Sequence, residues 1–306
     1  MVSITTDGGQ SSGPPDATFR LDDFKVAARD IAEPDLTALL ALSVSVGWSH
    51  RAADWAFMRS VGRGLVAMDE SGRVHGSVMW FPFGSDRATI GMLITTPRLQ
   101  SNGGGLWLMG HALAQTKGRA LGLHATKQSH RLCRSLGFGD EGTVYQHQGH
   151  VGAIPDVMTS PDAQVRELTG ADLPAIRTID RLATGWDRDR LIDALAEQSR
   201  GMVLVRGDQV EGYALARPFG RGVVFGPVIA NSEKDALSVL APLIAMHSGC
   251  YGRIDTGSIT GRVADFARQC GLEVVETVTR MSRDERWPFS SGDAPTQFAL
   301  ASHATG

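Results

Sequence analysis

The sequence predicts two α/β domains in tandem, and three observations support this prediction. The chain has 306 residues, which is about twice the length of a usual single domain. Short apolar runs that suit strands alternate with segments in which apolar residues recur at helical spacing. The two halves also repeat the same landmarks in the same order, which indicates a diverged duplication.

The composition is that of an ordinary globular protein and argues against several classes of function. The net charge is -3, and no cluster of lysine and arginine is interleaved with aromatic residues, so we expect no nucleic-acid partner. Three scattered cysteines favour a reducing compartment. No apolar run approaches the roughly 20 residues of a membrane span, and no signal peptide is evident, so we expect a cytoplasmic protein without membrane contacts.

The predicted domain boundaries follow shifts in composition. Residues 1–20 are rich in glycine, serine, proline and aspartate, and we expect them to form a disordered tail. The first domain should then cover residues 21–150 and the second residues 151–306. Pro155 and Pro161 interrupt the pattern at the start of the second domain.

Three landmarks carry the repeat. The first helix of each half reaches a Gly-Trp pair, at Gly47-Trp48 and at Gly185-Trp186. Two arms of a β-hairpin follow in each half. A shared Gly-x5-Pro-Phe-Gly then ends at Gly84 in the first half and at Gly220 in the second, with identical spacing.

A glycine-rich segment after the first of these hairpins predicts an anion site. A strand over 88–95 is stopped by Pro97, and Gln100 to Gly105 leads into a helix that begins at Leu106. Backbone N–H groups are unpaired at a helix start and attract anions, and glycine lets a pyrophosphate approach closely. Glycine is also common at helix starts that bind nothing, so a purely structural role is the alternative.

The motif Gln100-x-x-Gly103-x-Gly105 resembles the Gln/Arg-x-x-Gly-x-Gly/Ala pyrophosphate loop of GNAT acyltransferases. A strand over 120–126 and a helix that ends in Leu-Cys-Arg-Ser-Leu-Gly-Phe138 are also similar to that family. From Val26 onward the chain resembles a bacterial tandem-GNAT group, through segments such as 123–126 and 185–188.

This resemblance implies a mixed, mostly antiparallel central sheet flanked by helices in each domain. It also implies direct attack of the acceptor on acetyl-CoA or another acyl-CoA, with no metal. The residues that it assigns to acyl-CoA binding are Met92, Leu93, Ile94, Gln100, Ser101, Asn102, Gly103, Gly104, Gly105, Leu106 and Thr126.

Two residues depart from the family pattern where the chemistry would occur. His124 replaces the aspartate of the tandem group, and Cys133 replaces the tyrosine that many members place near the leaving sulfur. Both side chains can exchange protons near neutral pH, and we predict both as catalytic residues. A hydrogen-bonded structural histidine and a small core cysteine are the alternatives. Their spacing with His130 matches no common metal pattern.

Two tryptophans, Trp48 and Trp80, are predicted to line the acceptor pocket, with core packing as the alternative. Asp54 and Asp86 are weaker candidates for a base that acts through water, because solvated surface carboxylates are the commoner case.

The second half lacks the glycine loop and places Glu233 and Asp235 in the first turn of the corresponding helix. We expect this half not to bind CoA, and to wall the acceptor pocket or to mediate contacts in a homodimer. The function predicted for the whole chain is N-acetylation of a small primary amine. The alternatives are acyl transfer to a hydroxyl, acyl-CoA decarboxylation, and non-catalytic acyl-CoA sensing.

Overall fold

The computed structural model describes residues 15–21, 24–287 and 294–306. The first half contains strands β1 (Thr18–Leu21), β2 (Phe24–Asp30), β3 (Arg63–Asp69), β4 (Val74–Phe83), β5 (Arg87–Thr95), β6 (Ala120–Ala125) and β7 (Gly139–His150). Its helices are α1 (Leu36–Ser45), α2 (Ala52–Val61), α3 (Pro97–Ser101), α4 (Gly104–Gln115) and α5 (Lys127–Ser135).

The second half repeats this order of elements. Its strands are β8 (Gln164–Glu167), β9 (Arg200–Arg206), β10 (Gln209–Phe219), β11 (Gly222–Ala230), β12 (Tyr251–Thr256), β13 (Glu273–Arg283) and β14 (Thr296–Ala299). A 3-10 turn at Gly170–Asp172 precedes helices α6 (Leu173–Thr184), α7 (Asp189–Gln198), α8 (Glu233–Ala245) and α9 (Arg262–Gln269).

Strand β1 begins inside the segment that was expected to be a disordered tail. Thr18 pairs with Ala27 and Phe19 with Val26, in an antiparallel ladder with β2. The predicted tail of residues 1–20 therefore extends too far, because edge pairing orders its last residues. Residues 1–14 lie outside the described part of the chain.

The strands of the described residues form one mixed sheet with the order β1-β2-β3-β4-β5-β6-β13-β7-β12-β14-β11-β10-β9-β8. Most neighbouring pairs are antiparallel, whereas β5–β6 and β11–β12 are parallel. This is the predicted α/β class, with a mostly antiparallel sheet and flanking helices.

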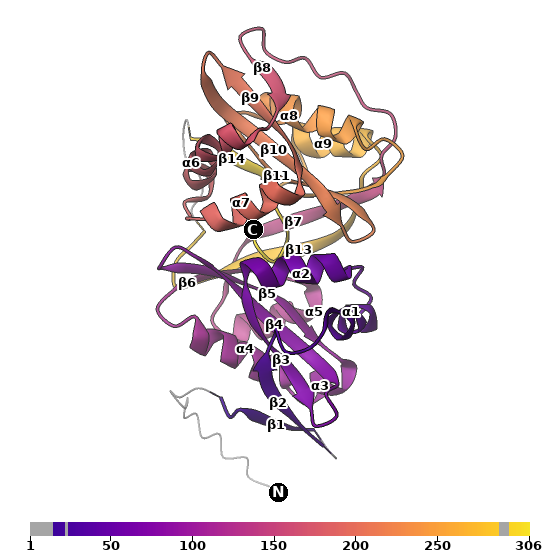
Figure 1. Ribbon diagram of the computed structural model, residues 1–306, viewed down its shortest axis with the longest axis vertical. Coiled ribbons are helices and arrows are strands. Elements are labelled where there is room, and N and C mark those ends of the chain that lie inside the picture. Colours follow the sequence, from indigo (N-terminus) through magenta and orange to yellow (C-terminus); the bar gives the residue numbers. More distant parts are fainter. Residues whose placement is uncertain (1–14, 22–23, 288–293) are drawn as a thin grey trace, which may run out of the picture.

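The two halves exchange one long strand each, β7 and β13, at the centre of this sheet. β13 of the second half pairs with β6, and β7 of the first half pairs with β12. β7 and β13 also pair with each other, from Glu273 opposite Gln148 to Ser282 opposite Gly139. Figure 1 shows both strands where the indigo-to-magenta half meets the orange half. Each half therefore needs a strand of the other to complete its sheet.

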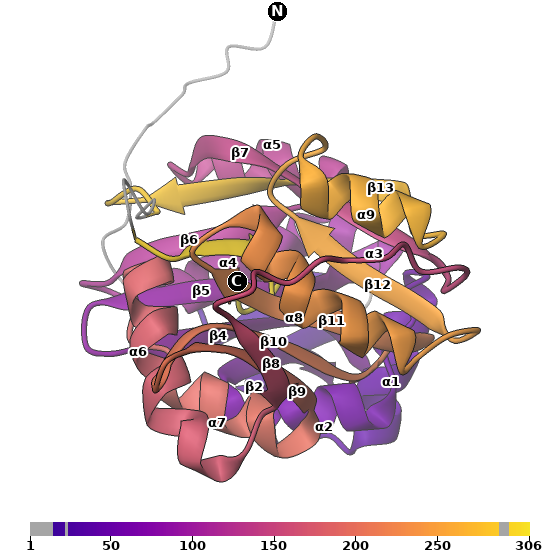
Figure 2. The same ribbon diagram turned by 90° about the horizontal axis from the view of Figure 1, so that it is seen from above.

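Helices cover both faces of the sheet. In the second half, Tyr213 and Leu215 of β10 pack with α6 and α7, whereas the alternate residues Ala214 and Ala216 pack with α8. This alternation is the period of a strand with two buried faces. Figure 2, seen from above, shows α7 and α8 on either side of β10.

The first half follows the same plan, and the two halves share one core. Val78 of β4 packs in a cluster with Leu108 of α4, and Met79 packs on the other face with residues of α1 and α2. That second cluster continues into α6 and α7, so the α1–α2 face of the first half and the α6–α7 face of the second half bury each other.

A β-bulge interrupts β5 beside the predicted site. β4 pairs Met79 with Gly91 and Ser77 with Ile94, so two residues of β5, Met92 and Leu93, oppose a single residue of β4. Met92 has a φ of 51°, which is uncommon outside glycine. Bulges take backbone N–H groups out of the ladder and re-aim side chains, and they are frequent near active sites.

Candidate active site

The predicted glycine loop is shorter than expected. Gln100 and Ser101 belong to the short helix α3, which Pro97 can start because proline suits the first helical turn. Only Asn102 and Gly103 separate α3 from α4, and α4 begins at Gly104 instead of Leu106. The chain reverses at Gly103, whose φ of 81° favours glycine.

The start of α4 has the properties of an anion site. No side chain caps it, whereas Asp35, Thr126 and Ser232 cap α1, α5 and α8. Its first turn carries no acidic residue, and Gly103 is exposed at the surface. The free N–H groups and the positive end of the helix dipole are thus available to a negatively charged group.

The adjoining strands also open where an acyl-CoA would have to enter. Among the described residues, the parallel pairing of β5 with β6 ends at Ile90 and Leu123, although β5 continues to Thr95. The bulge at Met92 and Leu93 begins just beyond the last pair. The predicted acyl-CoA residues 92–94 therefore lie in the part of β5 that extends beyond its pairing with β6. The start of α4 comes next along the chain, after the short helix α3.

The corresponding place in the second half is closed in three ways. β14 pairs with β11 from Val228 to Ala230 and with β12 at Thr256, so it fills the opening between those strands. The bulge of β11 contains Pro227, which has no N–H to donate. Helix α8 is capped by Ser232, and its first turn carries two acidic residues.

His124 lies on the face of β6 that points away from α4. Its Nδ1 is 2.9 Å from the carbonyl oxygen of His303. A carbonyl can only accept, so Nδ1 carries the proton and Nε2 is left with its lone pair. Nε2 is buried and has no partner in the described residues. Burial, more than any other cause, lowers the pKa of His124 to about 3, so the ring is neutral at pH 7.

Cys133 does not meet His124. It is 3% exposed and packs on the opposite face of β6, in the cluster of Leu123 and Leu108. Burial raises the pKa of its thiol to about 11, so the group is protonated at neutral pH. Its surroundings are those of a small core residue. The catalytic role of Cys133 stays a prediction.

The two predicted acceptor tryptophans also lie on different faces. Trp80 is buried among the residues that pack on α4. Trp48 is half-buried in the α1–α2 connection, edge-on to His50 with ring centroids 5.4 Å apart. Only Trp48 is therefore on the side of the sheet that His124 faces.

The chain end covers this face of β5 and β6. Thr89 donates to the carbonyl oxygen of Ala304 (2.7 Å), and a Cβ added to Gly91 would lie 2.8 Å from the Cβ of Ala304. Trp287 also packs there, stacked on Trp186 at 4.5 Å. Residues of the second half thus form the wall opposite α4.

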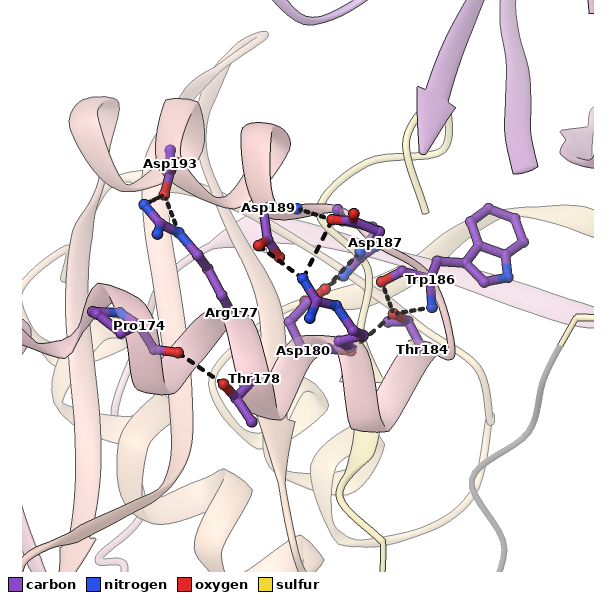
Figure 3. A network of polar contacts seen from close by, with 11 residues as sticks. Pro174, Arg177, Thr178, Asp180, Thr184, Trp186, Asp187, Asp189 and Asp193 are labelled. Carbon is purple, nitrogen blue, oxygen red and sulfur yellow. Dashed lines mark hydrogen bonds and ion pairs between the residues drawn. The ribbon is translucent and has the colours of Figure 1, made fainter. Parts of the chain in front are cut away.

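A buried polar network fixes that wall. The guanidinium of Arg188 donates to Asp180 (2.9 and 2.6 Å) and to a main-chain oxygen of Gly306 (2.7 Å), and Tyr213 donates to Asp180 (2.6 Å). Figure 3 shows Asp180 on α6 and Trp186 projecting from the end of that helix. The predicted Gly-Trp-Asp-Arg segment is therefore the element that holds the chain end against the first half.

The weaker carboxylate candidates are placed differently by the structure. Asp54 is buried, and its oxygens accept from Arg51 and from the backbone N–H of Gly220. This bond joins α2 to the hairpin of the second half. Asp86 is exposed, near Arg87.

His50 is a site residue that sequence reasoning missed. Its ring lies edge-on to Phe219, with the centroids 5.7 Å apart, and its Nδ1 is 3.0 Å from the hydroxyl of Ser43. Burial lowers the pKa of His50 to about 4. Ser43 and Trp48 are near neighbours in the sequence, but the contact with Phe219 joins His50 to the second half and has no local signal.

Other features of the described residues lie away from this face. Nowhere among the described residues do three histidine, cysteine or carboxylate side chains lie close enough together to hold a metal ion. His130 contacts Asp140 at the surface. A hollow of about 530 Å³ lies wholly in the second half, between α6–α7 and β8–β9. Within the same residues, no helix has the length and apolar character needed to cross a membrane.

Comparisons with known proteins agree with this architecture. A family model described as an acetyltransferase (GNAT) domain matches residues 176–293. The chain is similar to YitH of Bacillus subtilis (strain 168), named as an uncharacterized N-acetyltransferase, with 26% identity over 90% of this chain and 96% of that protein.

Solved structures show the same fold along most of the chain. An acetyltransferase structure from Pyrococcus horikoshii superposes with a TM-score of 0.73 and 17% identity, over 92% of this chain and 96% of that one. A tandem GNAT protein from the clavulanic acid biosynthesis pathway gives a TM-score of 0.57 and 12% identity, over 84% and 98%. The chain therefore has the GNAT acetyltransferase fold, and the family and sequence matches indicate an N-acetyltransferase enzyme.

Proposed function

We propose that the protein transfers the acetyl group of acetyl-CoA to the primary amine of a small molecule, at a single site in the first half. The observation that carries this proposal is the uncapped start of α4, which follows the bulged strand β5 with only the short helix α3 between them. The second half supports it by contrast, since β14, Pro227 and the acidic start of α8 occupy the equivalent positions.

The residues fit the parts of an acyl-CoA by their chemistry. The N–H groups at Gly104 and Gly105 would bind the pyrophosphate, and the bulge at Met92 and Leu93 would offer backbone donors to the thioester carbonyl. Acetyl-CoA supplies the activated acyl group, so no nucleophilic side chain is needed. The enzyme must orient the acceptor and accept a proton.

His124 is the residue best suited to orient the amine. Its unpartnered Nε2 can accept a hydrogen bond from an acceptor N–H, which would direct the nitrogen lone pair. With a pKa near 3 the ring is a weak base, so it would take a proton only as the nitrogen becomes positively charged during attack.

Gly105→Glu tests the cofactor site without removing packing. A Cβ at this position would lie 3.3 Å from the end of the Leu132 side chain, and a carboxylate in the first helical turn suits the helix dipole. The negative charge should repel the pyrophosphate and weaken acetyl-CoA binding by at least about tenfold in calorimetry. Gly170→Glu, in open space at the 3-10 turn of the second half, is the matched control.

Turnover is tested separately with acetyl-CoA and a panel of amines, by following free thiol. We expect thiol release that depends on the amine and that Gly105→Glu reduces. Equal binding of acetyl-CoA by wild type and Gly105→Glu would refute the site, and the absence of amine-dependent release across the panel would refute the reaction.

A further inference from the structure

Arg217 is a buried cation whose hydrogen-bonding edge is empty. It stands near the end of β10, its side chain is 2% exposed, and its Nε and Nη2 are buried without a partner in the described residues. Unpaired charged donors in a protein interior are costly, and each such group in a native structure calls for an explanation.

Three other arginines show what this edge normally does in the protein. Arg51, Arg188 and Arg253 each direct Nε and Nη2 at the carboxylate of one aspartate, at distances between 2.6 and 3.2 Å. This side-on pair of donors matches the two oxygens of a carboxylate. In Arg217 the same two donors, Nε and Nη2, have no partner among the described residues.

The neighbouring acids are already used. Asp54 is held by Arg51 and by Gly220, and Asp255 is held by Arg253. Burial, with a contribution from Arg51 and Arg253, lowers the pKa of Arg217 to about 10, so the guanidinium is still charged at pH 7. One positive charge in this region therefore lacks a negative hydrogen-bonding partner.

The guanidinium is positioned by both halves. Its Cζ lies 4.9 Å from the ring centroid of Phe57 on α2 and 4.9 Å from that of Phe219 on β10. Rings stacked on the face of a guanidinium leave its edge available. The side chain is thus held in place, while Nε and Nη2 have no hydrogen-bond partner among the described residues.

Contacts connect Arg217 to the face on which the acceptor would react. The Cζ of Arg253 also lies over the ring of Phe219, 5.6 Å from its centroid. Asp255 lies 3.4 Å from Nε2 of His303, and the carbonyl of His303 accepts from His124. The empty cationic edge and the unpartnered Nε2 of His124 stand at the two ends of this chain of contacts.

We infer that the acceptor is an amine that also carries a carboxylate, and that Arg217 binds this carboxylate through Nε and Nη2. The inference rests on the proposed function and narrows its substrate class. The carboxylate would provide the missing partner of Arg217, while the amine end of the same molecule donates to His124. A residue of the second half would then select the substrate of the first.

The test uses matched pairs of acceptors with the full-length protein. Glycine, β-alanine and longer ω-amino acids are each compared with the corresponding amide, which keeps the amine and removes the negative charge. For at least one chain length we expect kcat/KM to be about 10- to 100-fold higher for the acid, which is the range for hydrogen bonds to a charged group.

Arg217→Lys keeps the positive charge and removes the paired donors. It should lower the preference for the acid by at least about fivefold, because lysine has no side-on pair of donors for the two carboxylate oxygens. Unchanged binding of acetyl-CoA in calorimetry reports that the variant is folded. Arg221→Lys, on the exposed turn of the same hairpin, is the matched control and should keep the preference. Equal turnover of acid and amide by the wild type would overturn the inference and leave the acetyltransferase proposal standing. A preference that is undiminished in Arg217→Lys would do the same.

Failure of the proposed function is recognised separately. If no amine releases thiol, the proposal of acetyl transfer fails, and the same acid and amide pairs are compared as ligands by thermal unfolding. Stabilisation by an acid that is absent with its amide and is weaker in Arg217→Lys would support the carboxylate site. No difference between acid and amide in that assay would overturn it.

Discussion

Acidification from pH 7 to pH 5 should remove a large part of the stability of this protein. The largest contributions come from His50 and His124, whose pKa values burial lowers from 6.5 to about 4 and about 3. Burial also lowers the pKa values of His111 and His147, which act in the same direction. His50 and His124 are neutral in the folded protein at either pH, whereas the unfolded chain takes up protons below pH 6.5. Their contribution is complete above pH 6.5 and is lost as the pH falls toward the folded values.

The size of the effect follows from these values. At pH 5 each histidine has an unfolded pKa about 1.5 units above the pH, which corresponds to about 2 kcal/mol of lost unfolding free energy. The two residues together give about 4 kcal/mol, against a typical total of about 5–15 kcal/mol. Carboxylates such as Asp255, whose folded pKa is lowered, lose their contribution mainly below this window.

Urea unfolding at pH 7, 6 and 5 measures this loss directly. His50→Phe and His124→Phe each remove one titrating group, so each should reduce the loss of unfolding free energy between pH 7 and pH 5 by about 2 kcal/mol. Phe57→Leu weakens the same core without removing a titrating group and should show the wild-type loss. A wild-type change below about 1 kcal/mol between pH 7 and pH 5 would refute the reasoning.

Three further predictions concern the buried parts of the site. Asp180→Asn leaves Arg188 without its counter-charge and should cost about 3–5 kcal/mol in urea unfolding, whereas Asp193→Asn, in the partly exposed pair with Arg177, should cost less than about 1 kcal/mol. Iodoacetamide should modify Cys250 in the folded protein, and Cys133 and Cys270 only after unfolding, as peptide mass spectrometry can show; rapid native modification of Cys133 would contradict its burial. Gly91→Ala brings a Cβ within 2.8 Å of Ala304 and should cost about 1–3 kcal/mol in urea unfolding, and Ala304→Gly should relieve part of this loss.

Local features of the fold were predictable because they depend on short stretches of sequence. The Pro-Phe-Gly turns are an example. Gly84 and Gly220 both have a φ of 55°, which explains why glycine is the last residue of the motif in each half. The cap of α8 is another, since Ser232 accepts from the N–H of Asp235 as a serine before an apolar run should.

The start of α4 was predicted in position but not in detail. The motif predicted a glycine reversal just before this helix, and the structure has that reversal at Gly103, between α3 and α4. The motif did not reveal that residues 97–101 form a helical turn of their own, which shortens the loop to Asn102 and Gly103. The anion-binding argument is unchanged, because it depends on the free N–H groups of α4.

Partners distant in the sequence could not be predicted. Residues 139–150 and 273–283 have the alternation of strands, but alternation does not say which neighbour each will choose. Likewise nothing in the sequence joins Arg217 to Phe57, or His124 to His303. These pairs arise only when the two halves pack together, and they include every residue on which the proposed acceptor specificity depends.

The exchange of strands explains why a half that is proposed not to bind CoA would be retained. Cutting the chain near Pro161 would remove β13 from its place beside β6 and leave one edge of the site unpaired. It would also remove the chain end, which first fills the opening of the second half as β14 and then covers Thr89 and Gly91 of the first. The segment from β14 to residue 306 therefore closes the position in the second half that is equivalent to the proposed site. It also covers one face of that site in the first half. On the proposed function, loss of CoA binding in one copy and completion of the acceptor pocket in the other are consequences of the same path of the chain.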